Sequence, residues 1–189
     1  EEYFSYIGEQ KISNRLYNDY LKACNYLGLD MSDKKNRFPH DFKRWHDIRI
    51  DEYESAKAKA DDELKKEFYE QFASVANKYL PLQRDKNGIY LVFIAKSPAE
   101  LVNEGLALHH CVGKMGYDKK FVREETLIFF IRSADAPDVP LVTMEYSLKS
   151  NKVLQIYANG NTRPTEDVQT FIQKKWLPYA KRQLKKIAA

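Results

Sequence analysis

The spacing of the apolar residues changes at Asn87-Gly88, and this change limits the folds that are available to the chain. Before it, apolar residues recur every three or four positions over residues 11–27 and 41–80, a pattern that predicts helices. A turn-rich loop over residues 30–39 separates the two predicted helices. We expect the mostly charged middle of the second helix, residues 57–67, to lie in solvent.

After Gly88 the pattern becomes that of a sheet. Short apolar runs bounded by turn residues predict strands at residues 89–95, 126–132, 141–147 and 153–158. The run at 126–132 is apolar on both faces and is expected to be central, and short turns join the last three runs as in antiparallel hairpins. Ser97-Pro98-Ala99-Glu100 has the pattern of a helix start, and we expect Leu101, Val102 and Leu106 of that helix to be buried.

A last helix is predicted after Arg163-Pro164, with a kink at Pro178. Its inward side chains are expected to be those of Val168, Ile172, Trp176, Tyr179 and Leu184. The order of helices, then strand-helix-strand-strand-strand-helix, predicts an α+β fold. We therefore expect a helical region over residues 1–87 and, over residues 88–189, an α+β domain with a mostly antiparallel sheet of about four strands and packing helices.

The composition fits a globular protein in a reducing compartment. Of the 189 residues, 43% are hydrophobic and 31% are charged, which argues against disorder. Apolar runs such as residues 127–131 are too short to cross a bilayer, and no leader pattern opens the chain. Cys24 and Cys111 fall in different predicted elements, so we expect no disulfide and a cytoplasmic location without membrane contact. A start at Glu1 without Met leaves open that the chain is a fragment.

Residues with reactive side chains gather where the helix that starts near Ser97 ends. The run Leu108-His109-His110-Cys111-Val112-Gly113 is followed by Tyr117. The strands that come next each carry one conspicuous polar residue, namely Arg132, Glu145 and Gln155, and Asn161 follows the last strand. Two readings stay open. The polar residues form the solvated face of an antiparallel sheet, or they form a catalytic or recognition pocket.

Within the His-His-Cys run, consecutive side chains diverge, so at most two of the three serve one site. The plausible pairs are His109 with Cys111 and His110 with Tyr117. Cys111 is either a thiolate nucleophile activated by an imidazole or a small buried side chain. We predict no metal site, because the chain has no Cys-x-x-Cys motif and few residues outside the run could complete a zinc site, namely Cys24, His40 and His46.

The last predicted helix is basic. Residues 88–189 carry 15 Lys and Arg against 10 Asp and Glu, a net charge of +5. Six of these cations lie on the last helix: Lys174, Lys175, Lys181, Arg182, Lys185 and Lys186. Such a helix is usually a solvated face, and its functional alternative is weak, sequence-independent binding to the phosphates of a nucleic acid.

Residues from about 89 to 165 resemble the PcfJ-like domain, which occurs in proteins of conjugative plasmids, integrative elements and some phages. The matching residues are Glu104-Gly105, Leu108, His110-Cys111-Val112-Gly113, Tyr117, Arg132, Pro140, Thr143-Met144-Glu145, Gln155 and Gly160-Asn161. The helical region before residue 88, including Phe38-Pro39, resembles the less distinctive upstream part of the family. The chain departs from the family at Tyr157-Ala158-Asn159, where relatives are shorter or more basic.

The resemblance implies a mobile-element setting and a shared polar constellation, but it supplies no reaction and no cofactor. Our leading hypothesis is an active or ligand pocket that acts on nucleic acid and is built by His110, Tyr117, Arg132, Glu145, Gln155 and Asn161. In it His110 is an acid/base, Glu145 is the complementary carboxylate and Arg132 holds an anion, while Gln155 and Asn161 orient the substrate. His110, Arg132, Glu145 and Gln155 should then converge in one cleft.

The alternative hypothesis is a noncatalytic module that binds nucleic acid or a protein partner of the mobile element during plasmid transfer or replication. In that case the polar residues lock the core, Arg132 neutralises Glu145, and the basic helix is the working surface.

Overall fold

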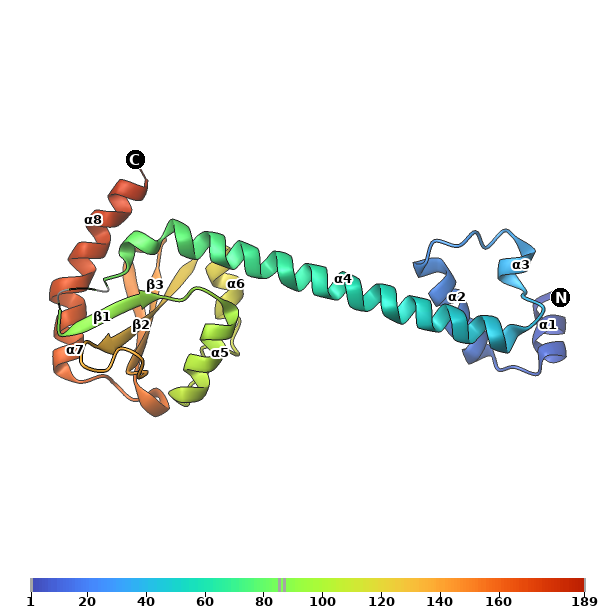
Figure 1. The fold of residues 1–189 in the computed structure, drawn as a ribbon, viewed down its shortest axis with the longest axis horizontal. Helices are drawn as coiled ribbons and strands as arrows, with labels where there is room; N and C mark the ends of the chain where they lie inside the picture. Colours follow the sequence, from blue (N-terminus) through green and yellow to red (C-terminus); the bar gives the residue numbers. More distant parts are fainter. Residues whose placement is uncertain (1, 85, 87, 189) are drawn as a thin grey trace. The chain divides into compact units, whose positions relative to one another are not determined.

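The structure is a computed structural model of the chain and describes residues 2–84, 86 and 88–188 (Figure 1). It contains N-terminal helices followed by a four-stranded antiparallel sheet with packing helices, so the predicted α+β class is confirmed. The chain divides into two compact units, Glu1–Lys66 and Glu67–Ala189. The sequence predicts a boundary between residues 87 and 88, and residue 87 itself lies outside the described part. The second unit begins earlier because Phe72, Val75 and Ala76 are buried in the core of the sheet.

The first unit is held by a small aromatic core. The first unit contains α1 (Glu2–Gln10), α2 (Asn14–Tyr26), α3 (Lys34–Arg37) and the first part of α4 (Phe42–Lys78). Three tyrosine hydroxyls donate to backbone carbonyls at the end of α3 and just after it: Tyr6 to Pro39 at 2.7 Å, Tyr17 to Arg37 at 2.7 Å, and Tyr20 to Asn36 at 2.6 Å. These bonds fix a segment that we expected to be loop throughout, and α1 was not anticipated. Residues 57–67 of α4 are exposed or nearly so, as predicted.

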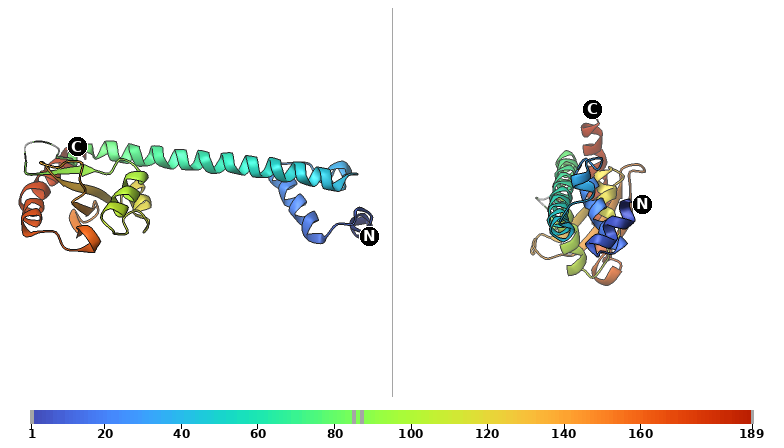
Figure 2. Two further views of the ribbon diagram at one scale, coloured as in Figure 1. Left: turned by 60° about the horizontal axis from the view of Figure 1, so that its bottom comes forward. Right: turned by 90° about the vertical axis from the view of Figure 1, so that its right-hand side faces the viewer.

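The second unit is built on the sheet β1-β2-β3-β4, with antiparallel neighbours throughout. The strands are β1 (Tyr90–Ile94), β2 (Thr126–Ser133), β3 (Val142–Ser147) and β4 (Lys152–Tyr157). The helices are η1 (Leu80–Leu82), α5 (Pro98–Ala107), α6 (Tyr117–Val122), η2 (Asn159–Asn161), α7 (Glu166–Phe171), η3 (Ile172–Trp176) and α8 (Leu177–Ile187). The central position predicted for the strand at 126–132 is confirmed. The helices α7 and α8 lie on one side of the sheet and α5 and α6 on the other (Figures 1 and 2).

The face toward α7 and α8 holds the main apolar core. Trp176 is fully buried, and its indole N–H donates to the carbonyl of Leu82 at 3.0 Å. The rings of Phe129 and Tyr146 meet it edge-on, with centroids at 4.9 and 5.6 Å. Of the five residues expected to face inward, Val168, Ile172 and Trp176 are buried, and the other two are partly buried. The helix irregularity precedes Pro178 as the π-helical turn η3, because proline has no N–H and fits the first turn of α8.

The helix α5 begins as predicted, with the Ser97 hydroxyl accepting from the backbone N–H of Glu100 at 3.2 Å. Leu101 is buried, but the expected burial of Val102 and Leu106 is wrong, since they are 45% and 63% exposed. The buried stripe instead continues from Leu101 through Glu104, Gly105 and Leu108. The carboxylate of Glu104 therefore lies on the inward face of α5, whereas the apolar pattern had predicted that Leu106 would face inward.

Candidate functional site

The sheet face that α5 and α6 cover carries the polar residues. In the strand register Ile128 of β2 pairs with Glu145 of β3, and Glu145 pairs with Gln155 of β4. Two residues further along each strand, Phe130 of β2 pairs with Thr143 of β3, and Thr143 pairs with Tyr157 of β4. Since residues two apart on a strand share a face, these side chains all point to one side of the sheet. The solvated face that we considered as the alternative is not observed at Glu145 or Thr143, which are 4% and 6% exposed.

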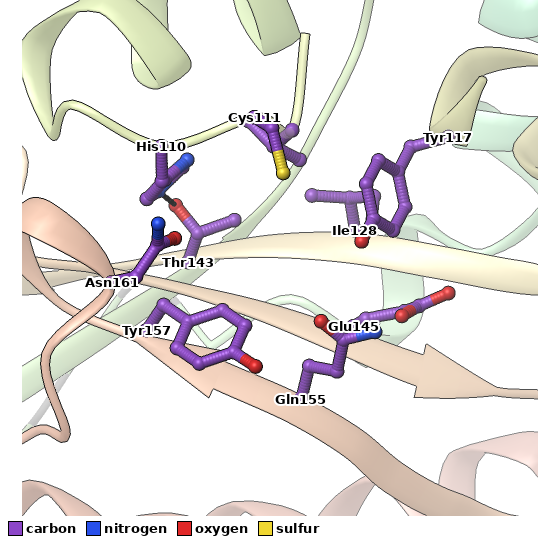
Figure 3. Close-up of a pocket in the computed structure, with 10 residues that line it drawn as sticks. His110, Cys111, Tyr117, Ile128, Thr143, Glu145, Gln155, Tyr157 and Asn161 are labelled. Carbon is purple, nitrogen blue, oxygen red and sulfur yellow. Dashed lines mark hydrogen bonds between the residues drawn. The ribbon is translucent and has the colours of Figure 1, made fainter. Parts of the chain in front are cut away.

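A small pocket lies above this face, with a cavity volume of about 30 Å³ (Figure 3). Its lining residues are His110, Cys111, Val112, Tyr117, Ile128, Thr143, Glu145, Gln155, Tyr157 and Asn161. A buried water needs about 10–15 Å³ of such space, so the cavity is large enough for one or two waters. Of the four side chains predicted to share one cleft, three line this pocket, and Arg132 does not.

The end of α5 turns His110 and Cys111 toward the pocket. His109 adopts a left-handed backbone conformation with φ 53°, and the N–H of His110 donates to the carbonyl of Gly105 at 3.0 Å. This is the pattern of a Schellman C-terminal cap. His109 lines a neighbouring hollow of about 390 Å³ but not the pocket, whereas His110 and Cys111 line both. The pocket therefore brings together His110 and Tyr117, one of the two predicted pairs, and it adds Cys111, whereas the other pair is separated because His109 does not line the pocket.

The loop that carries His110 and Cys111 packs closely against α5, and two glycines, Gly105 and Gly113, make this close packing possible. A Cβ atom on Gly113 would lie 2.6 Å from the Cα of Val102, and a Cβ atom on Gly105 would lie 2.9 Å from the carbonyl oxygen of His110. Real Cβ atoms do not approach backbone so closely. Both positions therefore require glycine for the loop to keep its place.

Asn161 reaches the pocket from the turn after β4. Gly160 and Asn161 have positive φ values of 62° and 59°. The N–H of Gly160 donates to the carbonyl of Leu108 at 2.7 Å, which ties this turn to the end of α5. Asn161 is brought beside His110 and Cys111 by this tie, and all three line the neighbouring hollow as well.

Glu145 is the most unusual group in the pocket. It is 4% exposed, and neither of its carboxylate oxygens has a hydrogen-bond partner among the described residues. The Nζ atom of Lys120 lies 3.8 Å from Oε1, at the outer limit of an ion pair, and Lys120 is itself 41% exposed. Burying a carboxylate with so little compensation is costly. The neutralisation of Glu145 by Arg132, expected under the alternative hypothesis, is not observed.

Tyr117 opens α6 beside this carboxylate. Burial raises the pKa of its phenol, and the negative charge of Glu145 adds to the increase. The Lys120 ammonium lies 5.1 Å from the centroid of the Tyr117 ring. Figure 3 shows the phenol oxygen of Tyr117 on the same side of the pocket as Glu145 and Gln155. At neutral pH Tyr117 is thus a protonated phenol, able to donate a hydrogen bond.

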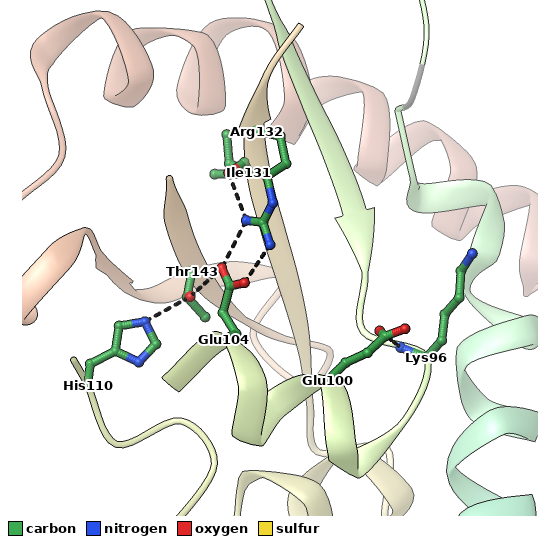
Figure 4. Close-up of polar contacts among 7 residues, drawn as sticks. All are labelled: Lys96, Glu100, Glu104, His110, Ile131, Arg132 and Thr143. Carbon is green, nitrogen blue, oxygen red and sulfur yellow. Dashed lines mark hydrogen bonds and ion pairs between the residues drawn. The ribbon is translucent and has the colours of Figure 1, made fainter. Parts of the chain in front are cut away.

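Arg132 belongs to a second polar cluster next to the pocket (Figure 4). Its Nη1 donates to Oε1 of Glu104 at 2.9 Å, its Nη2 bonds Oε2 of the same carboxylate, and Nη1 also donates to the carbonyl of Ile131 at 3.1 Å. Both partners are buried. Because both Nη atoms of Arg132 bond the Glu104 carboxylate, the anion that Arg132 binds is a side chain of the protein itself.

Thr143 joins this cluster to the pocket. Its Oγ1 lies 3.2 Å from Oε1 of Glu104 and 2.9 Å from Nε2 of His110. Burial lowers the pKa of His110 below its usual value, and the negative charge of Glu104 opposes that shift. His110 is therefore neutral at neutral pH, which suits a proton acceptor.

Sequence reasoning did not assign Glu104, Thr143 or Tyr157 to the site, although Glu104 and Thr143 are among the residues that carry the family resemblance. A signal existed for two of them. Thr143 alternates with Glu145 on one face of the predicted strand, and Glu104 follows Leu101 by three residues on the inward stripe of α5. A β-bulge interrupts the alternation between β3 and β4, because Tyr146 pairs with Val153 while Glu145 pairs with Gln155. Val153 and Gln155 are two residues apart on β4, yet they oppose β3 residues that point in opposite directions.

The cations of the last helix are all exposed, and no ion pair involves any of them in the described part of the chain. They are Lys174 and Lys175 in η3 and Lys181, Arg182, Lys185 and Lys186 in α8. Spacings of four and seven residues place them on one side of the helix. Among residues 2–84, 86 and 88–188, no group of three His, Cys, Asp or Glu side chains could hold a metal ion. In the same residues no helix has the length and apolar character that a bilayer crossing requires.

The family model described as "PcfJ-like protein" matches residues 16–172. The chain belongs to the PcfJ-like family. The match covers most of both compact units and contains every residue of the pocket. The chain is also 27% identical, over 165 residues, to the uncharacterized protein Lin1253/Lin1744 of Listeria innocua serovar 6a. The similar segment is 87% of this chain and 34% of that protein, so the chain spans about a third of the length of this relative. No solved structure matches.

Proposed function

We propose that this PcfJ-like chain carries an acid–base active site that acts on nucleic acid, in a protein of a mobile genetic element. The observation that supports the proposal is the buried carboxylate of Glu145, which has no hydrogen bond among the described residues and only a long ion pair with Lys120, in a pocket with His110, Tyr117, Gln155 and Asn161. Protein folding does not favour such a carboxylate, because an apolar side chain at that position would be more stable. Uncompensated groups of this kind are typical of functional sites.

In the proposed site His110 is the proton acceptor, since it is neutral and lines both the pocket and the adjoining hollow. Glu145 and Tyr117 are the complementary acid–base groups, and the amides of Gln155 and Asn161 orient the substrate. Cys111 is a candidate nucleophile, because it is exposed and lines the same two spaces. Arg132 is not assigned to hold an anion of the substrate, because Glu104 already occupies both of its Nη atoms.

The substrate is expected to sit in the hollow of about 390 Å³ and to reach the pocket past His110, Cys111 and Asn161. The pocket alone is too small for more than water. Lys114 also lines the hollow, and a lysine there is suited to a phosphate group. This arrangement favours a substrate that carries phosphate, such as a nucleic acid strand.

The test is Glu145→Gln, compared with Thr126→Val as a matched control. Thr126 lies on the neighbouring strand, is 6% exposed, and also has an unpartnered oxygen, but it does not line the pocket. We expect both variants to melt within a few degrees of the wild type, which corresponds to about 1 kcal/mol. Transfer or replication of the mobile element should be lost in cells with Glu145→Gln and kept with Thr126→Val. A large drop in melting temperature for Glu145→Gln, with a parallel loss of function, would show a structural role instead.

A second candidate function is noncatalytic binding of nucleic acid by the six cations on the last helix. The observation that favours it is their shared exposure on one side, with no acidic partner in the described residues. Binding of this kind depends on phosphate charge and not on base sequence.

A further inference from the structure

The hydrogen-bond chain Arg132–Glu104–Thr143–His110 has a direction that the chemistry of its members favours. Arg132 donates from both Nη atoms to the two oxygens of Glu104. Because a guanidinium is always charged and both groups are buried, Glu104 is held as an ionised carboxylate that can only accept hydrogen bonds.

Thr143 has a single hydroxyl hydrogen, and two groups lie within reach of its oxygen. Oε1 of Glu104 is 3.2 Å away and Nε2 of His110 is 2.9 Å away. The carboxylate can only accept, so the hydroxyl donates to Glu104. The lone pairs of Oγ1 then remain for His110, and Nε2 must carry the ring proton in order to donate to them.

We propose that Glu104 and Thr143 are positioning residues that hold neutral His110 as its Nε2–H tautomer and leave Nδ1 as the proton-accepting nitrogen of the site. The role of Nδ1 as a proton acceptor in catalysis rests on the proposed function, but the assignment of the tautomer does not. When Nδ1 takes a proton, an N–H bond forms there, and the positive charge that appears on the ring faces the negative charge of Glu104 through Thr143. The same logic places a carboxylate behind the histidine of catalytic triads.

The opposite arrangement is a real competitor. In it Thr143 would donate to Nε2, and the ring proton would sit on Nδ1, near the carbonyl group of His110 itself. Glu104 would then lose its bond from Thr143. The tautomer is therefore a measurable consequence of the charge on Glu104, and it can be read without a substrate or an activity assay.

The test is the tautomer of His110, read from long-range proton–nitrogen NMR spectra of the full chain at a pH above the pKa of the histidine. The signals are assigned by their loss in His110→Gln. We expect the wild type and Thr143→Ser to show the Nε2–H form alone. Thr143→Val, which removes the acceptor at nearly constant volume, should give a mixture of the two tautomers, and so should the apolar double variant Glu104→Leu/Arg132→Met.

Two results overturn the proposal: a wild type in the Nδ1–H form or in a mixture, or variants that keep the wild-type tautomer unchanged. If Thr143→Val does not fold, the double variant decides, because it leaves no buried charge unpaired. Failure of the proposed function is a separate result. It is seen when Glu145→Gln keeps element transfer while the tautomer still follows Thr143 and Glu104.

Discussion

The backbone N–H of Gly160 donates to the carbonyl oxygen of Leu108 at 2.7 Å and so joins the turn after β4 to the end of α5. The two segments are about fifty residues apart in the chain, and each contributes polar side chains to the pocket. The site is thus assembled from a helix end and a strand end that are fixed by backbone contacts. Changes to this backbone should disturb the site before they disturb the sheet.

The first prediction concerns Gly113. In Gly113→Ala the new Cβ atom would lie 2.6 Å from the Cα of Val102 and 3.0 Å from the carbonyl oxygen of Leu101. Both neighbours are backbone atoms of α5 and cannot rotate away, so the loop that carries His110 and Cys111 must move. We expect a loss of about 1–3 kcal/mol in the free energy of unfolding, as for other overpacked sites. Urea denaturation measures it.

Gly8→Ala is the matched control for this prediction. Gly8 lies inside α1, and a Cβ atom there meets nothing within 4 Å. Alanine in a helix interior is favoured over glycine by about 0.5–1 kcal/mol. The control should therefore be neutral or stabilising. A Gly113→Ala protein as stable as the control would show that the loop tolerates the shift.

Much of the fold could be predicted from the sequence because local patterns determine it. The apolar periods locate the long helix and all four strands, and Ser97-Pro98 marks the start of α5. The pattern also selected Glu145 and Gln155, which lie opposite each other in the register. These features depend only on which residues are apolar and on where turns interrupt them.

The partners of the polar residues could not be predicted in the same way. Arg132 pairs with Glu104, which comes from a helix 28 residues earlier in the chain. That pairing depends on how α5 lies on the sheet, and strand alternation carries no information about it. The bulge in β4 similarly depends on the register with β3. Sequence reasoning therefore singled out Arg132 and Glu145 among the buried polar residues, but it did not find the residues that Arg132 bonds.

The second prediction tests the Arg132–Glu104 pair. Arg132→Met leaves the buried Glu104 carboxylate without its cation, and we expect the free energy of unfolding to fall by about 3–5 kcal/mol. Adding Glu104→Leu removes the unpaired charge and should restore most of the loss. Both values come from urea denaturation of the single and double variants. If Arg132→Met alone stays within about 1 kcal/mol of the wild type, the pair is not the structural contact described here.

The third prediction is a pH dependence that comes from His110. Burial lowers its pKa in the folded chain below the usual value of 6.5, so the unfolded chain binds the proton more readily. The stabilisation from a neutral His110 is complete above the unfolded pKa and is lost as the pH falls through 6.5 toward the folded pKa. His110→Gln should flatten the fall in stability between about pH 7 and pH 5. Equal slopes in the variant and the wild type would contradict this.

The fourth prediction concerns the two cysteines. Cys24 is fully buried in the aromatic core of the first unit, and burial raises the pKa of its thiol. Cys111 is exposed at the rim of the pocket. Iodoacetamide should therefore alkylate Cys111 in the native protein, and Cys24 only after unfolding, which mass spectrometry of the peptides can follow. Equal labelling of the two thiols before unfolding would contradict the burial of Cys24, and no labelling of Cys111 in the native protein would mean that the pocket rim is not open as described.

The last prediction concerns the basic side of η3 and α8. Reversing the charge at Lys174, Lys175, Lys181 and Lys185 should weaken binding to labelled single- and double-stranded oligonucleotides, measured by fluorescence anisotropy at low salt. Each phosphate contact contributes about −0.9 to the slope of log affinity against log salt on duplex DNA, so the slope should become shallower by up to about 3–4.

The matched control reverses four exposed lysines of the first unit, Lys22, Lys57, Lys59 and Lys65, and changes the net charge equally. We expect the control to lose much less affinity. Equal losses would show that only the total charge matters, and no binding by the wild type at low salt would remove this function.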